Sequence, residues 1–99
     1  MTTTTLHAVD ELGTRFADAV LRTGILRLGR AGWDRARILA HADRFCEIAR
    51  PLAKAGAGRA LDEARELKAF APWAAVAFQA EAMAAGTTAA ERLMAEVVA

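Results

Sequence analysis

The longest helical pattern in this chain is RALDEARELKAFAPWAAVAFQAEAMAAG, residues 59–86. Small and apolar side chains recur in it every three or four positions, which places them on one stripe of a helix about 40 Å long. The members of this stripe are Leu61, Ala64, Leu67, Ala71, Ala74, Phe78, Ala82 and Ala85. Asp62 and Glu63 lie in the first turn, where free amides and the helix dipole favour negative charge. The rest of the chain is expected to cover this stripe.

The composition predicts an all-α protein. Alanine, which loses least on entering a helix, dominates the 99 residues, and there are only two prolines. No stretch alternates apolar and polar residues between turns, as a strand would. A chain of this length is close to the size at which two helices need a partner to bury their apolar faces. We therefore predict a long amphipathic antiparallel helical hairpin or small bundle, completed by self-association to a dimer or tetramer.

The prolines and glycines divide the predicted single domain into two arms. Residues 1–4 are interpreted as a flexible N-terminus, residues 5–55 as the first arm and residues 59–98 as the second. Gly56-Ala57-Gly58 is a turn signal between the arms, after a kink at Pro51. Pro72 is expected to bend the second arm. Gly86 is expected to open a final segment, with a capping box at Thr88 to Glu91.

The first arm has two interpretations around residues 30–32. Glycines at 24, 29 and 32 favour a break and a restart near Trp33 and Asp34, since each costs roughly 1 kcal/mol in a helix interior. The apolar stripe, however, keeps its phase across this region, which favours one continuous helix. Arg35 falls on the apolar side and fits neither interpretation.

The charges are unevenly distributed, although the formal net charge is only +1. Residues 20–59 contain nine basic and three acidic side chains, and both flanking segments are acidic. Such a division can pair helices within a hairpin or a dimer, or present a basic face to a partner. The low net charge argues against nucleic-acid binding.

No group of residues forms a recognisable catalytic or metal site. His41 and Cys46 lie about 140° apart on a helix, so they do not share a metal ion, and Cys46 is interpreted as a small core residue. His7, near Asp10 and Glu11, is interpreted as part of a solvated terminus. The glycines lack the Gly-Lys-Ser/Thr continuation of a phosphate-binding loop. We expect neither enzymatic activity nor a cofactor.

The chain is expected to lie in the cytoplasm, without transmembrane insertion. A single cysteine forms no internal disulfide, and the N-terminus lacks the basic and apolar regions of a signal peptide. The longest uncharged run, residues 69–80, has 12 residues, whereas a membrane-spanning helix needs roughly 20.

Residues 51–55, the glycine turn and residues 60–70 follow an order that resembles phasins, the bacterial proteins that coat polyhydroxyalkanoate granules. In that pattern a second helix opens with acidic and leucine residues that lead to an aromatic residue, and Leu61, Glu63, Leu67 and Phe70 match it. The resemblance extends over residues 16–98. The glycine turn and Pro72-Trp73 depart from the pattern.

The resemblance implies a non-catalytic protein that adsorbs to the granule surface through one apolar helix face while charged side chains keep the other face hydrated. The contact residues expected on this basis are Leu21, Ile25, Leu28, Trp33, Leu39, Phe70, Trp73 and Phe78. Two alternatives remain open. The stripe can be covered permanently by another protein chain, as in a helical interaction subunit, or the arginines can bind nucleic acid.

Overall fold

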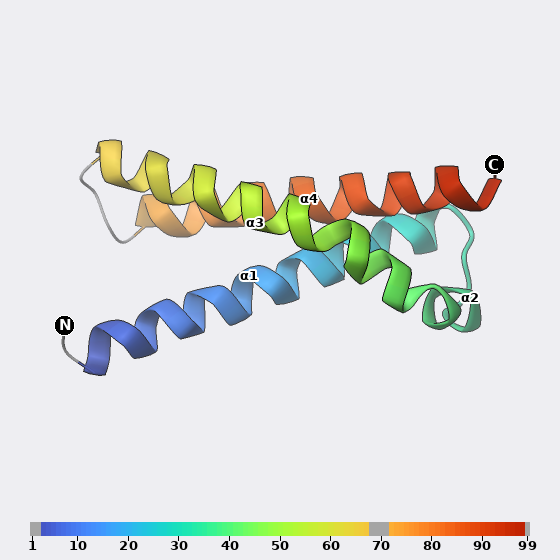
Figure 1. The fold of residues 1–99 in the computed structure, drawn as a ribbon, viewed down its shortest axis with the longest axis horizontal. Helices are drawn as coiled ribbons and strands as arrows, with labels where there is room; N and C mark the ends of the chain where they lie inside the picture. Colours follow the sequence, from blue (N-terminus) through green and yellow to red (C-terminus); the bar gives the residue numbers. More distant parts are fainter. Residues whose placement is uncertain (1–2, 68–71, 99) are drawn as a thin grey trace.

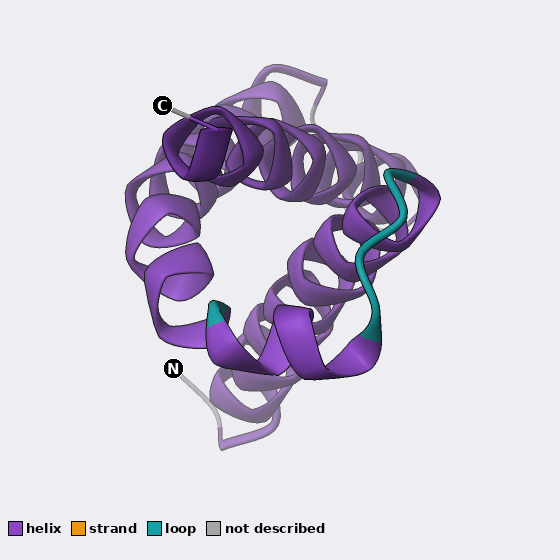
Figure 2. Cartoon of the chain, turned by 90° about the vertical axis from the view of Figure 1, so that its right-hand side faces the viewer, coloured by secondary structure: helices purple, strands orange, loops and turns teal. Residues whose placement is uncertain are grey.

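The computed structural model describes residues 3–67 and 72–98, with side chains described for residues 14–63 and 76–98. The described residues form four helices: α1 (Thr3–Arg30), α2 (Arg35–Ala40), α3 (Ala42–Leu67) and α4 (Pro72–Val98). The all-α prediction is confirmed, because no strand occurs in these residues. The three long helices pack as a small elongated bundle, and the short α2 lies across one end of it (Figures 1 and 2).

Helix α4 is the central element, because it packs against both α1 and α3 while α1 and α3 contact each other little. Helices α3 and α4 run antiparallel as a hairpin, and two ion pairs fix their register. Arg44 and Arg59 of α3 bind Glu96 and Glu81 of α4, respectively, so the pairs advance in opposite directions along the two helices. An antiparallel hairpin is therefore present, as the predicted fold class requires, but it joins α3 to α4 and not the two predicted arms (Figure 1).

Helix α1 runs parallel to α4 and crosses it. Phe16 packs edge-on against Phe78, with 5.9 Å between the ring centroids. One contact further along both helices, Gly24 lies against Gly86. The interval between these contacts is eight residues on each helix, which confirms that the helices run in the same direction.

The core lies along the inner sides of α1, α3 and α4. Helix α4 contributes mainly alanines, which are fully or nearly fully buried, whereas α1 and α3 contribute larger side chains. The buried cluster consists of Phe16, Val20, Leu28, Trp33, Phe45, Ile48, Ala49, Ala82, Ala85, Ala89, Ala90 and Leu93. Small residues on α4 let two larger helices approach its axis at once.

The first arm breaks after Arg30, so the interpretation as one continuous helix is wrong. Gly32 has φ +93°, a left-handed conformation that favours glycine. Asp34 then caps α2, because its Oδ1 accepts a 2.8 Å hydrogen bond from the Arg37 amide. The periodicity of the apolar residues wrongly indicated one continuous helix. The chain changes direction after Arg30, and the six-residue helix α2 begins a new periodicity there. Arg35 is simply the exposed first residue of α2.

The turn predicted at Gly56-Ala57-Gly58 is not formed, and α3 continues through it to Leu67. Gly56 is buried against α4, where an added Cβ would lie 3.3 Å from the Cβ of Glu81. Next to it, Arg59 binds Glu81. Packing against α4 thus outweighs the weak helix propensity of two glycines, roughly 1 kcal/mol each. The first arm therefore does not end at residue 55, and the second does not begin at residue 59.

The predicted helix over residues 59–86 is divided between α3 and α4, because Pro72 starts a helix instead of bending one. Proline is well suited to the first helical position, since an amide there has no partner within the helix. Helix α4 then continues through Gly86, so no separate final segment begins there, and the capping box at Thr88 is not used as a helix start. The other end of the chain differs less: α1 begins at Thr3, two residues before the predicted start.

The basic middle of the chain pairs with acids of α4. Arg44 forms a bidentate pair with Glu96, in which its Nε lies 2.8 Å from Oε2. Arg59 binds Glu81, and Arg27 lies 3.6 Å from Glu91. Of the two uses predicted for the uneven charge, the structure thus shows pairing between helices of one chain.

Candidate interaction surface

The eight predicted contact residues do not form one surface. Leu28 and Trp33 are buried in the core, with 2% and 8% of their surface exposed. Leu28 was predicted from an apolar stripe whose covered side could not be identified from the sequence, and Trp33 from its place on the predicted first helix. Both side chains belong to the buried cluster, so they are unavailable to a partner in the folded chain.

Trp33 closes the core beneath α2. Its amide donates a hydrogen bond to the Leu28 carbonyl, which holds it at the break after α1. The guanidinium of Arg37 lies 4.2 Å from the centroid of its ring, and the ring of His41 packs beside it at 5.1 Å. Stacking by these polar residues shields the indole from solvent. Trp33 is therefore a structural residue that anchors α2 to the bundle.

Phe78 is also turned inwards. It is partly buried and packs against the core through Phe16. Phe70 lies outside the described residues, and Trp73 lies in the first turn of α4 but its side chain is outside those described. Of the three predicted contact residues in the second arm, only Phe78 therefore has a described side chain.

Leu21, Ile25 and Leu39 are accessible, with 41%, 48% and 63% of their surface exposed. Leu21 and Ile25 stand one turn apart on α1, and Ala17 and Gly29 continue the line in both directions with exposed, uncharged positions. We call Ala17, Leu21, Ile25 and Gly29 the α1 stripe. It runs along α1 for more than three turns without a charge.

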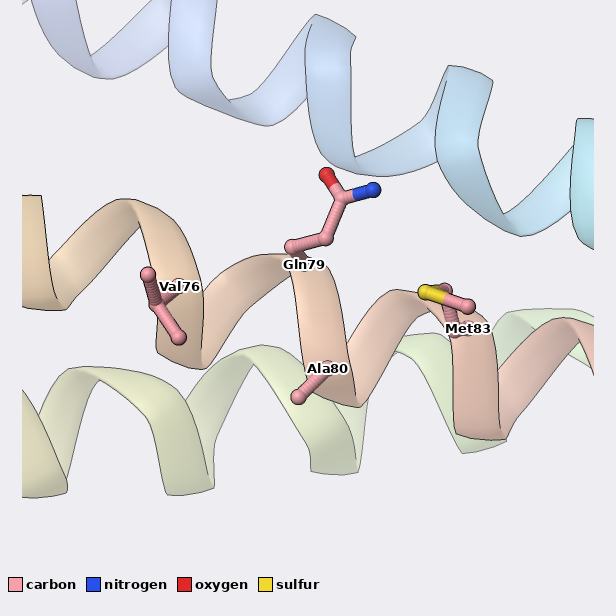
Figure 3. A pocket seen from close by; sticks show the side chains of 4 residues that line it. All are labelled: Val76, Gln79, Ala80 and Met83. Atoms are coloured by element: carbon pink, nitrogen blue, oxygen red, sulfur yellow. The ribbon is translucent and has the colours of Figure 1, made fainter.

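A second exposed apolar surface lies on α4 and was not among the predicted residues. Val76, Ala80 and Met83 follow one another along one side of the helix, and Gln79 points from beside them towards α1 (Figure 3). These four side chains line a shallow hollow of about 400 Å³ that is open to solvent. Leu26 of α1 and Met83 both line an adjoining hollow, whose α1 side also carries Arg15, Asp18 and Arg22.

This second surface has a signal in the sequence. Between Pro72 and Ala90, α4 has a single charged residue, Glu81, and that residue is bound by Arg59. A helix that is apolar on all sides is expected to be covered on all sides. In the bundle α1 and α3 cover only two sides of α4, so Val76 and Met83 stay exposed, with 60% and 48% of their surface accessible.

The described residues offer little for chemistry. No group of three or more His, Cys, Asp or Glu side chains is arranged to hold a metal ion among them. None of their polar or charged side chains is buried. Cys46 is exposed on α3, which corrects its interpretation as a core residue. His41, the other predicted candidate there, is engaged through its Nδ1 with the Arg37 carbonyl at 2.9 Å, and His7 lies outside the described side chains.

Within the described residues, no helix combines the length and apolarity needed to cross a bilayer. Two groups of accessible apolar side chains stand out as surfaces among the described residues, the α1 stripe and the outer side of α4, whereas Leu39, Leu61 and Val97 are exposed elsewhere. No protein-family model, curated protein or solved structure matches this chain.

Proposed function

We propose that this protein is a non-catalytic helical protein that adsorbs to a hydrophobic surface through the α1 stripe. The surface implied by the resemblance to phasins is that of a polyhydroxyalkanoate granule. The observation that carries the proposal is the exposure of Leu21 and Ile25, one turn apart, on an uncharged line of α1. Leu21 and Ile25 lie about 40° apart around the axis of α1, so both can touch one flat, featureless surface.

The energetics favour reversible binding. Fully burying a leucine or isoleucine contributes about 1.5–3 kcal/mol, so a side chain that is already half covered contributes roughly 1 kcal/mol. Leu21 and Ile25 together therefore supply about 2 kcal/mol, with smaller contributions from Ala17 and Gly29. Adsorption of this kind depends on area and needs no pocket, which agrees with the shallow hollows of the described surface.

The charged side chains beside the α1 stripe are consistent with α1 lying on a surface through this stripe. Asp18 and Arg22 follow Ala17 and Leu21 in the sequence and pair with each other at 3.1 Å, with both side chains exposed. They border the stripe with groups that stay hydrated when the apolar line is covered. The helix can thus lie on a surface without burying a charge.

The test is co-sedimentation of the purified chain with polyhydroxybutyrate particles at low and high salt. We expect saturable binding that persists at high salt, because the attraction is apolar. The variant Leu21→Asp/Ile25→Asp should bind at least about tenfold more weakly. Leu61→Asp/Val97→Asp is the matched control, since it adds the same charge at apolar positions of similar exposure on α3 and α4. Equal binding by both variants and the unsubstituted chain would contradict the proposal.

An interaction subunit is the second candidate, because the exposed, uncharged positions of the α1 stripe can also be covered by a helix of another protein. It predicts one stoichiometric complex with a protein and no uptake on particles. In that case, Leu21→Asp/Ile25→Asp would abolish the complex while the particles stayed unoccupied.

A further inference from the structure

We infer that the outer side of α4 binds a second copy of this chain, in an antiparallel pairing centred on Ala80. The surface consists of Val76, Ala77, Ala80, Met83 and Ala84, all of which are exposed or half-buried in the single chain. The inference goes beyond the proposed function and does not depend on it, because adsorption uses the α1 stripe and pairing uses α4.

The first argument is the absence of charge. The five residues are uncharged, and the nearest acid in the sequence, Glu81, is turned to α3, where Arg59 binds it. A partner that placed a charge against this surface would lose the hydration of that charge without gaining a counter-charge. The occupant must therefore present an uncharged helix side, and the chain itself has one.

The second argument is the order of large and small side chains. In an antiparallel pair with its two-fold axis at Ala80, Val76 of one copy faces Ala84 of the other, and Met83 faces Ala77. Each large side chain thus meets an alanine, and Ala80 meets its own copy. Two-fold interfaces require such self-complementarity, and ridges that fit into grooves let helices approach to about 8–10 Å. A parallel pairing would instead place Met83 against Met83 and Val76 against Val76.

The third argument is the exposed area. A folded monomer of this mass is expected to expose about 5,400 Å². This chain exposes 6972 Å² and is elongated, with extents of 46 × 24 × 19 Å. The excess, about 1,500 Å², is larger than the roughly 800 Å² that one partner contributes to an interface of standard size. The chain as a whole thus exposes enough surface for one interface of standard size, and an interface on α4 would be bordered by Leu26 of α1.

The decisive test is a disulfide across the two-fold axis. In a Cys46→Ser background, Ala80→Cys places one thiol at the axis, so mild oxidation should link two chains nearly completely. Leu61→Cys in the same background is the matched control, since it presents an exposed thiol on α3, away from α4's outer side, and should remain largely unlinked.

Sedimentation equilibrium of the full chain gives an independent measure. We expect a dimer. Its dissociation constant should rise about a hundredfold or more in Val76→Asp/Met83→Asp, because the new carboxylates would be buried against apolar side chains of the other copy. Helix content by circular dichroism confirms that the variant is folded. Leu21→Asp/Ile25→Asp should leave the dimer unchanged, which separates this result from particle binding.

Three outcomes would overturn the inference. They are a monomer at every concentration, a dimer that Val76→Asp/Met83→Asp does not weaken, and oxidation that links Ala80→Cys no faster than Leu61→Cys. If Val76→Asp/Met83→Asp leaves the dimer intact and oxidation links two chains through Leu61→Cys, the dimer would instead form through α3.

Discussion

Gly24 of α1 and Gly86 of α4 lie against each other where the two helices cross. A Cβ atom on Gly86 would lie 3.0 Å from the backbone nitrogen of Gly24 and would overlap the carbonyl oxygen of Val20. These are backbone atoms, so a side chain at this position cannot be accommodated by a rotamer change. The close approach of α1 to α4 therefore depends on the absence of a side chain at Gly86, whereas Gly24 mainly makes room for the ring of Phe45.

This contact predicts that Gly86→Ala destabilises the fold despite the better helix propensity of alanine. Overpacking costs about 1–3 kcal/mol, whereas the propensity gain is at most about 1 kcal/mol. We expect the free energy of unfolding to fall by about 1–2 kcal/mol in urea denaturation. Gly58→Ala is the control, because no atom lies within 4 Å of its added Cβ, and it should stabilise the protein. Stabilisation by both substitutions would contradict the close crossing.

The Arg44–Glu96 pair predicts a pH dependence of stability. Hydrogen bonds from the Arg44 guanidinium lower the pKa of the Glu96 carboxyl. Because the folded pKa lies below the unfolded value of about 4.3, the contribution is complete above that value and is lost as the pH falls through the folded pKa. The stability difference between the unsubstituted chain and Glu96→Gln should therefore shrink as the pH is lowered from about 5 to about 3.

The control for this pH dependence is the same substitution in an Arg44→Gln background. Glu96 then has no guanidinium partner, so Glu96→Gln should no longer change the pH profile in this range. High salt should also reduce the effect, since both side chains are solvent-exposed. An unchanged profile difference in the Arg44→Gln background would assign the effect to another group.

Gly32 should tolerate substitution poorly, because its φ of +93° is unfavourable for any residue with a Cβ. We expect Gly32→Ala to lower the free energy of unfolding by about 1–2 kcal/mol. Gly29→Ala, three residues earlier in the last turn of α1, has open space around its added Cβ and should be neutral or stabilising. Thermal unfolding of the two variants side by side measures the difference, and equal melting temperatures would argue against the left-handed turn.

Leu28 and Leu39, both predicted from the sequence as contact residues, should respond in opposite ways to truncation. Leu28→Ala removes a buried side chain and should cost about 2–5 kcal/mol of unfolding free energy. Leu39→Ala truncates a side chain that is 63% exposed and should change stability by no more than about 0.5 kcal/mol. Similar losses in chemical denaturation would show that α2 is covered in solution.

The helical class could be predicted because alanine favours a helix at almost every position, whatever surrounds it. The break after Arg30 was one of two interpretations, and Gly32 together with the cap at Asp34 was its local signal. The continuation of helix α3 through Gly56 and Gly58 was not indicated by the neighbouring sequence. It depends on Glu81, more than 20 residues away, which packs on Gly56 and binds Arg59.

The candidate surfaces were predictable only in part for a related reason. The periodicity shows that Leu21, Ile25 and Leu28 share a side of α1. Which of them is buried depends on how much of that side the other helices cover. On α4 the apolar residues surround the helix, so no stripe stands out and Met83 looks like any core residue. Only the packing of α1 and α3 shows that its side is left open.

The central position of α4 has a consequence for synthesis of the protein. Helices α1 and α3 contact each other little, and the surface that joins them comes from the helix that is translated after both. While α4 is still within the ribosome, the core lacks the helix that covers most of it, although Phe45 can already pack against Gly24 of α1. The bundle therefore folds after translation of α4, and the nascent chain exposes its future core until then.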